Sequence, residues 1–199
     1  MKTCTFQGES TVLARSHPWS TSASDEALRY LDFKTSPALI RPTLEDFLPF
    51  AHYPAIERFY GLVEWLNSAA SCGETNDCAF SAPEVDPEAS RMRRVWCTGR
   101  VMLLFRDLPR NVSGHDWPLF IDQLHRGLND LDRPFELGMI GTTLIPVHYR
   151  ALAEQRAPAE GLQLMISFWA WGGTEQVCMT NLARLFNNLS QVLRVISAA

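Results

Sequence analysis

The stretch 161-GLQLMISFWAWGGTEQVCMTNLARLFNNLSQVLRVI-196 changes its hydrophobic period at two consecutive glycines. Before Gly172 and Gly173, the apolar and aromatic residues of 161–171 predict a long strand. After the glycines, apolar residues recur at helical spacing and predict a helix over about 174–196. We therefore expect a strand followed by an amphipathic helix, with the apolar face of the helix packed on the strand.

The predicted C-terminal helix carries an apolar stripe whose members repeat at intervals of four and three residues. Phe186 and Leu193 widen this stripe to about three positions in seven, the width of a helix that packs into a globular core. We therefore expect the stripe to face the core of its own chain, and a homodimer through the C-terminal helix is the alternative. The members of the stripe are Cys178, Leu182, Leu185, Leu189, Val192 and Ile196.

Two further helices are predicted from periodicity, and three others from local signals. Apolar residues at helical spacing predict helices from Pro54 to about residue 69 and over 116–132. Thr43 with Asp46 resembles a capping box, and Ser24 or Asp25 is placed to cap a short helix through residue 33. A further short helix is expected within 146–155.

Strands are predicted where apolar and β-branched residues alternate between turn residues. Residues 3–6 and 11–14 flank the turn "QGES" and predict a hairpin. Residues 136–145 predict a strand whose glycines permit a bulge or close backbone contact. Residues 88–106 fit both a helix and a strand, and the alternation from Arg94 to Phe105 favours the strand.

Length and composition favour one globular domain. The chain has 199 residues, of which 46% are apolar and 20% charged, enough to bury a core. We expect residues 1–199 to form a single α+β domain, in which a mainly antiparallel sheet is packed by several amphipathic helices. No apolar run approaches the roughly 18 residues of a membrane span. Because the first 16 residues lack the apolar stretch of a signal peptide, we expect a cytoplasmic protein with no membrane partner.

The net charge of the chain indicates which class of partner it can bind. Eighteen basic and 22 acidic side chains give a net charge of −4. An acidic surface does not build the positive field that nonspecific nucleic-acid binding needs, so no nucleic acid is expected. Another protein is the expected partner, and a basic one would suit the negative charge.

The stretch "SCGETNDCAF" at 71–80 holds two of the five cysteines. Cys72 and Cys78 are separated by five residues, which is not the spacing of a structural zinc pair, and no second pair exists. Asp77 would raise the pKa of the Cys78 thiol and so disfavours a nucleophile. We expect this stretch to be a loop without a metal, and no cofactor is expected anywhere in the chain.

Six residues are the candidate binding set. In "RMRRVW", arginines precede a tryptophan, a combination that can grip phosphate or carboxylate groups; a solvated face is the alternative. In "SFWAWGG", two tryptophans share one side of the predicted strand and Phe168 the other, and core packing competes there with a binding role. The candidate binding residues are Arg91, Arg94, Trp96, Arg100, Trp169 and Trp171.

Three functions remain open. A protein-binding domain without catalysis ranks first, and one form of it is an immunity-type protein that neutralises a toxin. The chain has no glycine-rich phosphate loop, no Gly-x-Ser-x-Gly and no His-Glu-x-x-His. An enzyme would therefore need a site assembled from distant residues, and a subunit of a larger assembly is the third possibility. The candidates for the dispersed site are His52, Asp77, Arg94, Arg100 and His148.

Overall fold

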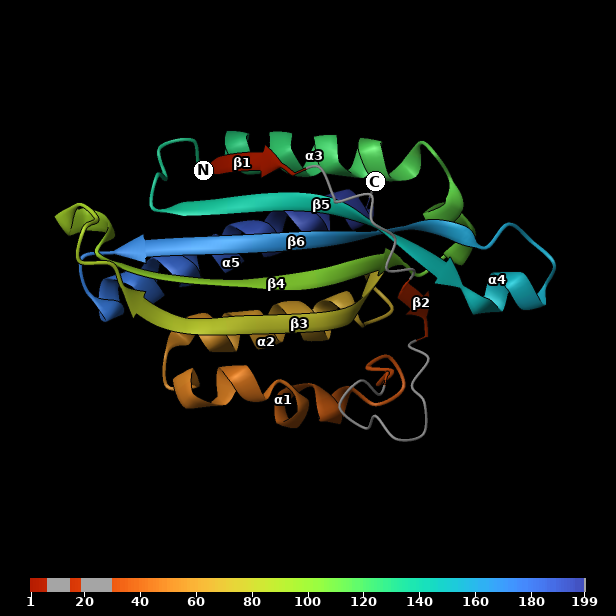
Figure 1. Cartoon of the computed structure of the whole chain (residues 1–199), viewed down its shortest axis with the longest axis horizontal. Helices are drawn as coiled ribbons and strands as arrows, with labels where there is room; N and C mark the ends of the chain where they lie inside the picture. The colour runs from red at the N-terminus through yellow and green to blue at the C-terminus, as the bar shows by residue number, and fades with distance from the viewer. Residues whose placement is uncertain (7–14, 19–29, 199) are drawn as a thin grey trace.

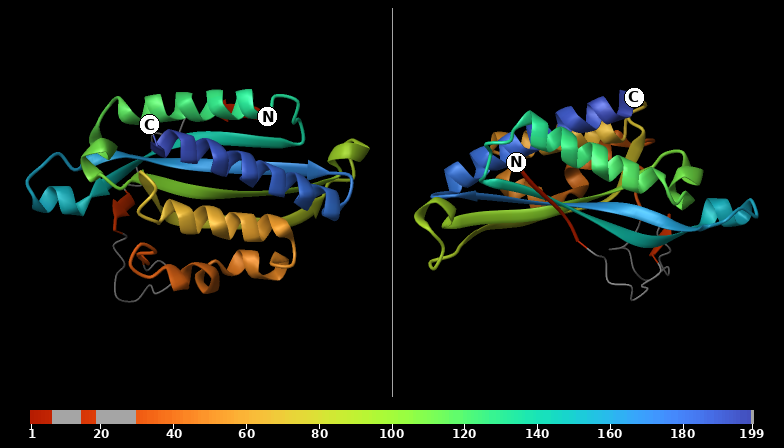
Figure 2. Two further views of the ribbon diagram at one scale, coloured as in Figure 1. Left: turned by 180° about the vertical axis from the view of Figure 1, so that it is seen from behind. Right: turned by 90° about the horizontal axis from the view of Figure 1, so that it is seen from above.

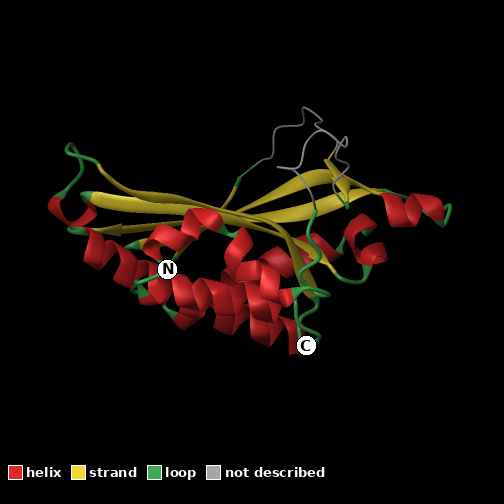
Figure 3. Cartoon of the chain, turned by 90° about the horizontal axis from the view of Figure 1, so that it is seen from below, coloured by secondary structure: helices red, strands yellow, loops and turns green. Residues whose placement is uncertain are grey.

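A computed structural model of the chain describes residues 1–6, 15–18 and 30–198. Strands form one sheet, and α2, α3 and α5 lie together across one of its faces (Figures 1 and 2). Viewed along the sheet, the helical layer lies on one side only of the strands (Figure 3). This arrangement confirms the predicted α+β class. Among the described residues, no helix is both long enough and apolar enough to cross a bilayer.

From Pro37 onward, the elements follow one another with short connections. The strands are β1 (Lys2–Thr5), β2 (Arg15–His17), β3 (Gly73–Val85), β4 (Val95–Phe105), β5 (Gly138–Tyr149) and β6 (Glu160–Gly172). The α-helices are α1 (Ile40–Thr43), α2 (Pro54–Leu66), α3 (Asp116–Leu131), α4 (Arg150–Glu154) and α5 (Glu175–Ala198). Short 3-10 helices occupy Pro37–Leu39, Glu45–Phe50, Arg91–Arg93 and Leu108–Val112.

The sheet is antiparallel over most of its width. Its order is β1-β5-β6-β4-β3, and the pairs β3–β4, β4–β6 and β5–β6 are all antiparallel. The exceptions are β1 and β2, which run parallel to β5 along the same edge. The first strand of the predicted N-terminal hairpin is therefore present as β1, but it pairs with β5. The expected second strand, 11–14, lies outside the described residues.

Helix α5 fills the centre of the helical layer. It packs on α2, α3 and β6, and the stripe of apolar side chains predicted from its spacing lies in the main core. Phe186 and Leu193 are buried as well. The expectation of an intramolecular core helix is confirmed. A homodimer could not use this stripe without unpacking the core, because its side chains already contact the chain's own sheet and helices.

The most instructive correction concerns the cysteine stretch. The stretch 71–80 was expected to be a loop, but from Gly73 onward it belongs to the strand β3, which pairs with β4 from Gly73 to Val85. Polar residues and Pro83 disfavour a strand by propensity, but β3 lies at the end of the sheet order, where such residues are tolerated. Breaks in register between Thr75 and Asp77 and between Ser81 and Glu84 absorb the extra residues as bulges.

Other boundaries also differ from the expectation. No side-chain bond caps the 3-10 helix Glu45–Phe50, and Thr43 ends α1, so the capping box is wrong. The strand β5 continues through Tyr149 because β2 and β6 pair with it on both sides, and the short helix starts only at Arg150. The predicted helix that ends at residue 33 lies mostly outside the described residues, and residues 30–32 are not helical. The strand alternative for 88–106 is confirmed from Val95 onward.

Candidate functional site

Three tryptophans gather on the sheet face opposite the helices. Trp96 of β4 and Trp171 of β6 are register partners, and Trp169 lies two residues along β6 on the same face. Phe168 faces the other way and packs on Phe186 of α5, at 4.9 Å between ring centroids. The predicted division of the β6 aromatics between the two faces is therefore observed, and Figure 1 looks onto the face that carries the tryptophans.

A phenylalanine from the N-terminal strand extends this group. Phe6 packs edge-on against Trp169 at 5.9 Å between centroids, and 43% of Phe6 is exposed. Gly141 of β5 makes room for both rings, because a Cβ there would come within 2.4 Å of Phe6 and 3.0 Å of Trp169. The three tryptophans are half-buried, so each presents part of its ring to solvent.

Arginines border the tryptophans. The guanidinium of Arg93 lies 5.2 Å from the centroid of the Trp171 ring and donates to the carbonyl of Glu136 at 3.1 Å. Arg100 donates to the Asp77 carboxylate at 3.0 and 3.1 Å, across the β3–β4 pair. We call this surface the aromatic face. It consists of Phe6, Arg93, Trp96, Arg100, Trp169 and Trp171.

The structure unites four of the six candidate binding residues, Trp96, Arg100, Trp169 and Trp171. Arg91 and Arg94 are exposed and lie before the strand begins. The backbone of Arg94 is helical, with φ −62° and ψ −30°, so the alternation that was expected to align it with Trp96 starts one residue later. Arg93, which was not in the candidate set, lies over Trp171 instead.

The dispersed catalytic site is not assembled. Of its five candidates, only Asp77 and Arg100 contact each other. His148 pairs with the exposed Glu160 at 2.7 Å near the α4 end of the sheet, and His52 packs on Tyr53 before α2. These contacts place the histidines at separate points of the fold, so the five residues do not converge on one pocket.

Cys78 and Cys97 have thiols whose pKa values are raised, the opposite of an activated thiol. Burial raises the pKa of Cys78 strongly, and the Asp77 carboxylate raises it further while Arg100 opposes this. The Cys97 and Cys178 thiols lie 3.5 Å apart inside the core, where the bond to Cys178 and burial raise the pKa of Cys97. Within the described ranges, no three His, Cys, Asp or Glu side chains are grouped so that they could hold a metal ion.

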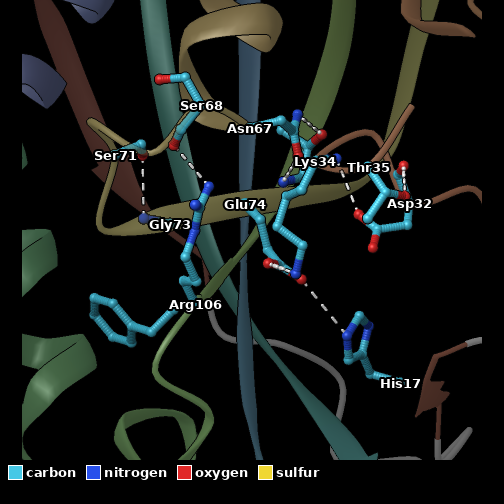
Figure 4. Close-up of polar contacts among 12 residues, drawn as sticks. His17, Asp32, Lys34, Thr35, Asn67, Ser68, Ser71, Gly73, Glu74 and Arg106 are labelled. Atoms are coloured by element: carbon cyan, nitrogen blue, oxygen red, sulfur yellow. Dashed lines mark hydrogen bonds and ion pairs between the residues drawn. The ribbon is translucent and has the colours of Figure 1, made fainter. Parts of the chain in front are cut away.

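A second polar site lies at the other end of the same sheet face, around Glu74 (Figure 4). Glu74 is 1% exposed, and its carboxylate forms an ion pair with the ammonium of Lys34. The Nε2 atom of the buried His17 lies 3.7 Å from the same carboxylate. Tyr30 bonds to Glu74 and packs edge-on against His17, at 5.1 Å between ring centroids.

Burial dominates the electrostatics of this second site. It lowers the pKa of His17 to about 4, and the Lys34 charge acts in the same direction. His17 is therefore neutral at pH 7, and Lys34 alone neutralises Glu74. Burial together with the Glu74 charge raises the pKa values of Tyr30 and Tyr149 well above their ordinary value, so both phenols stay protonated. The Glu74 carboxylate thus pairs with one ammonium, that of Lys34, and the Asp32 carboxylate adds a second negative charge nearby.

The turn before Glu74 is held by its own hydrogen bonds (Figure 4). Asn67 donates to the carbonyl of Val63 and to the hydroxyl of Thr75, both at 2.8 Å, and accepts from the Thr75 amide at 3.2 Å. Arg106 donates to the Ser68 carbonyl at 2.7 Å. These bonds fix the start of β3 to the end of α2 and so fix the position of the Glu74 carboxylate.

Sequence reasoning missed this second site because it treated 71–80 as a loop. Once the stretch is a strand, Glu74 is the register partner of Leu104 on the face away from the helices, where Lys34 and His17 cover it. Lys34 and Glu74 lie in separate parts of the sequence, and no spacing or motif links them.

Comparison of the chain with protein-family models, with curated proteins and with solved structures finds no match.

Proposed function

We propose that this protein is a binding module without intrinsic catalysis, which holds another protein against its aromatic face. The observation that carries the proposal is the placement of Trp96, Trp169 and Trp171 side by side on the sheet face that the helices leave open. The solvent-facing side of an antiparallel sheet ordinarily carries polar residues. Grouped and partly exposed aromatic side chains are instead typical of interaction surfaces.

The arginines indicate the chemistry of the partner. Arg93 is stacked on Trp171 and donates to a backbone carbonyl, and its guanidinium has no carboxylate partner among the described residues. Arg100 shares its charge with Asp77. A partner that brings an apolar centre and an acidic rim would complement this face better than the basic partner suggested by net charge.

A paired capture experiment tests the proposal. The wild-type chain, a Trp169→Ser/Trp171→Ser variant and a Leu119→Ser/Val195→Ser control are immobilised and exposed to extract of the organism that encodes the protein. The control removes exposed apolar side chains from α3 and α5, away from the aromatic face. We expect a partner held by the wild type and the control and lost by the tryptophan variant.

The captured protein is then identified, which decides whether it is a toxin, and its affinity is measured by calorimetry. Loss of two central tryptophans should weaken binding by about thirtyfold or more. Circular dichroism confirms that the variants are folded. Equal affinity of the tryptophan variant and the control, or no captured partner even at low salt, would contradict the proposal.

A further inference from the structure

The second polar site leads to a proposal that concerns the other end of the sheet face and is independent of the aromatic face. We define the strap as residues 15–18 and 30–35, which include β2, His17 and Lys34. We propose that the strap is a displaceable cover, and that the surface beneath it accepts a lysine-bearing extended segment of a partner protein.

The first step is that this end of the face is covered. Met102 and Leu104 of β4 are fully buried, yet they alternate with Val101 and Leu103, which point into the main helical core. They therefore lie on the face away from the helices, in the same row as Glu74. Within this row, the strap covers Glu74, because Lys34 pairs with its carboxylate and Nε2 of His17 lies 3.7 Å from it.

The second step concerns what holds the strap. Strand β2 contributes three residue pairs to the edge of β5, between Arg15–His17 and Val147–Tyr149. Lys34 contributes the ion pair to Glu74, and 31% of the Lys34 side chain remains exposed to solvent. A short parallel ladder and one partly accessible ammonium are contacts that a competing segment could reach and replace.

The third step is that the buried contacts are incompletely satisfied. Among the described residues, Nδ1 of His17 and Nε2 of Gln163 are buried and have no hydrogen-bond partner. Gln163 lies on the same sheet face, because its neighbour Leu164 belongs to the helical core. A buried polar network with unsatisfied members is less stable than a fully bonded one. His17 belongs to the strap, so opening of the strap would return one of these unsatisfied groups to water.

The fourth step identifies the occupant by its chemistry. A buried, singly charged carboxylate without an arginine fork requires one compact cation, and lysine provides a point charge on a flexible stem. Departure of β2 would free the edge of β5 at Val147–Tyr149 for an extended segment, the mode known as strand addition. Both requirements are met by an extended segment that carries one lysine, as the strap itself does.

The test uses a peptide with the sequence of residues 15–35 and the full-length chain carrying Lys34→Ala. The substitution removes the ion pair of the chain's own strap and leaves Glu74 free to accept the lysine of the peptide. We expect this variant to bind the labelled peptide about tenfold or more tighter than the wild type, whose tethered strap competes at high effective concentration. Fluorescence anisotropy measures the affinities.

Matched variants make the outcome decisive. The peptide carrying Lys34→Ala, and the Lys34→Ala chain carrying also Glu74→Gln, should both lose the binding. A Trp169→Ser/Trp171→Ser change in the Lys34→Ala chain should leave it unaltered, so failure of the aromatic face and failure of this proposal are distinguished. Equal peptide binding by wild type and Lys34→Ala, or none by either, overturns the proposal.

Hydrogen exchange of the unmodified wild-type chain gives a second measurement that does not depend on a variant folding. Amides of residues 15–17 should exchange about a hundredfold or more faster than amides at the centre of β4. Exchange of both groups at the same slow rate would show that the strap opens only with the whole molecule, and the proposal would then be wrong.

Discussion

At the scale of single residues, His17 makes the stability of this protein sensitive to acid. Its side chain is buried against Tyr30 and Tyr149 and faces Glu74, Lys34 and Asp32. The folded chain holds the pKa near 4, while an unfolded chain has the ordinary value of 6.5. Between these values the unfolded chain binds the proton and the folded chain does not. Stability therefore falls as the pH falls from about 6.5 to about 4.

The matched comparison is His17→Phe, which keeps a ring and removes the titration. The free energy of unfolding of the wild type relative to this variant should drop by at most about 3 kcal/mol between pH 7 and pH 4. Urea unfolding at a series of pH values measures the difference, and subtraction removes the contribution of His125, whose pKa is also lowered by burial. A constant difference across this range would contradict the assignment.

Gly99 is the second residue on which the fold depends individually. A Cβ at this position would lie 2.3 Å from the carbonyl oxygen of Ala79 and 2.4 Å from the Phe168 ring. Gly99→Ala should therefore force β3 and β4 apart and cost about 2–3 kcal/mol of stability. Gly61→Ala is the control, because nothing lies within 4 Å of its Cβ position in α2. It should stabilise by about 0.5–1 kcal/mol, and urea denaturation compares both variants with the wild type.

At the scale of elements, α5 contributes more to the stability of the core than its exposed residues suggest, because its apolar stripe is buried. Leu185 lies in the central stripe and is fully buried, whereas Val195 on the same helix is 71% exposed. Leu185→Ala should cost about 2–5 kcal/mol through lost burial and an internal cavity. Val195→Ala should change the free energy of unfolding by less than about 0.5 kcal/mol. Equal effects in chemical denaturation would show that the stripe does not face the core.

Helices and strands differed in how well the sequence predicted them. The stripes of α3 and α5 are long and strictly periodic, so their positions follow from local pattern alone. Local pattern did not predict β3, because the strand propensity of "ETNDC" is weak. Its pairing with β4 is a tertiary contact that overrides this propensity. Burial of Glu74 could not be foreseen either, because it depends on a strap that is distant in the sequence and lies across the sheet.

At the scale of the whole molecule, the two-layer arrangement explains why part of the site was predictable. Alternation in β4 and β6 places Trp96, Trp169 and Trp171 on one face, and this can be read from each strand separately. Their register, which aligns Trp96 with Trp171, comes only from the sheet. The contact of Arg93 with Trp171 depends on the turn before β4, where alternation has not begun.

The position of β6 has a consequence for how the chain is synthesised. This strand lies between β4 and β5 in the sheet, although it follows both of them along the chain. While a ribosome produces the polypeptide, β4 and β5 each keep an unpaired backbone edge until residues 160–172 have emerged. Nascent chains with exposed edges associate readily. A chain whose synthesis halts before residue 160 would therefore be prone to aggregate, and molecular chaperones would be needed most before β6 emerges.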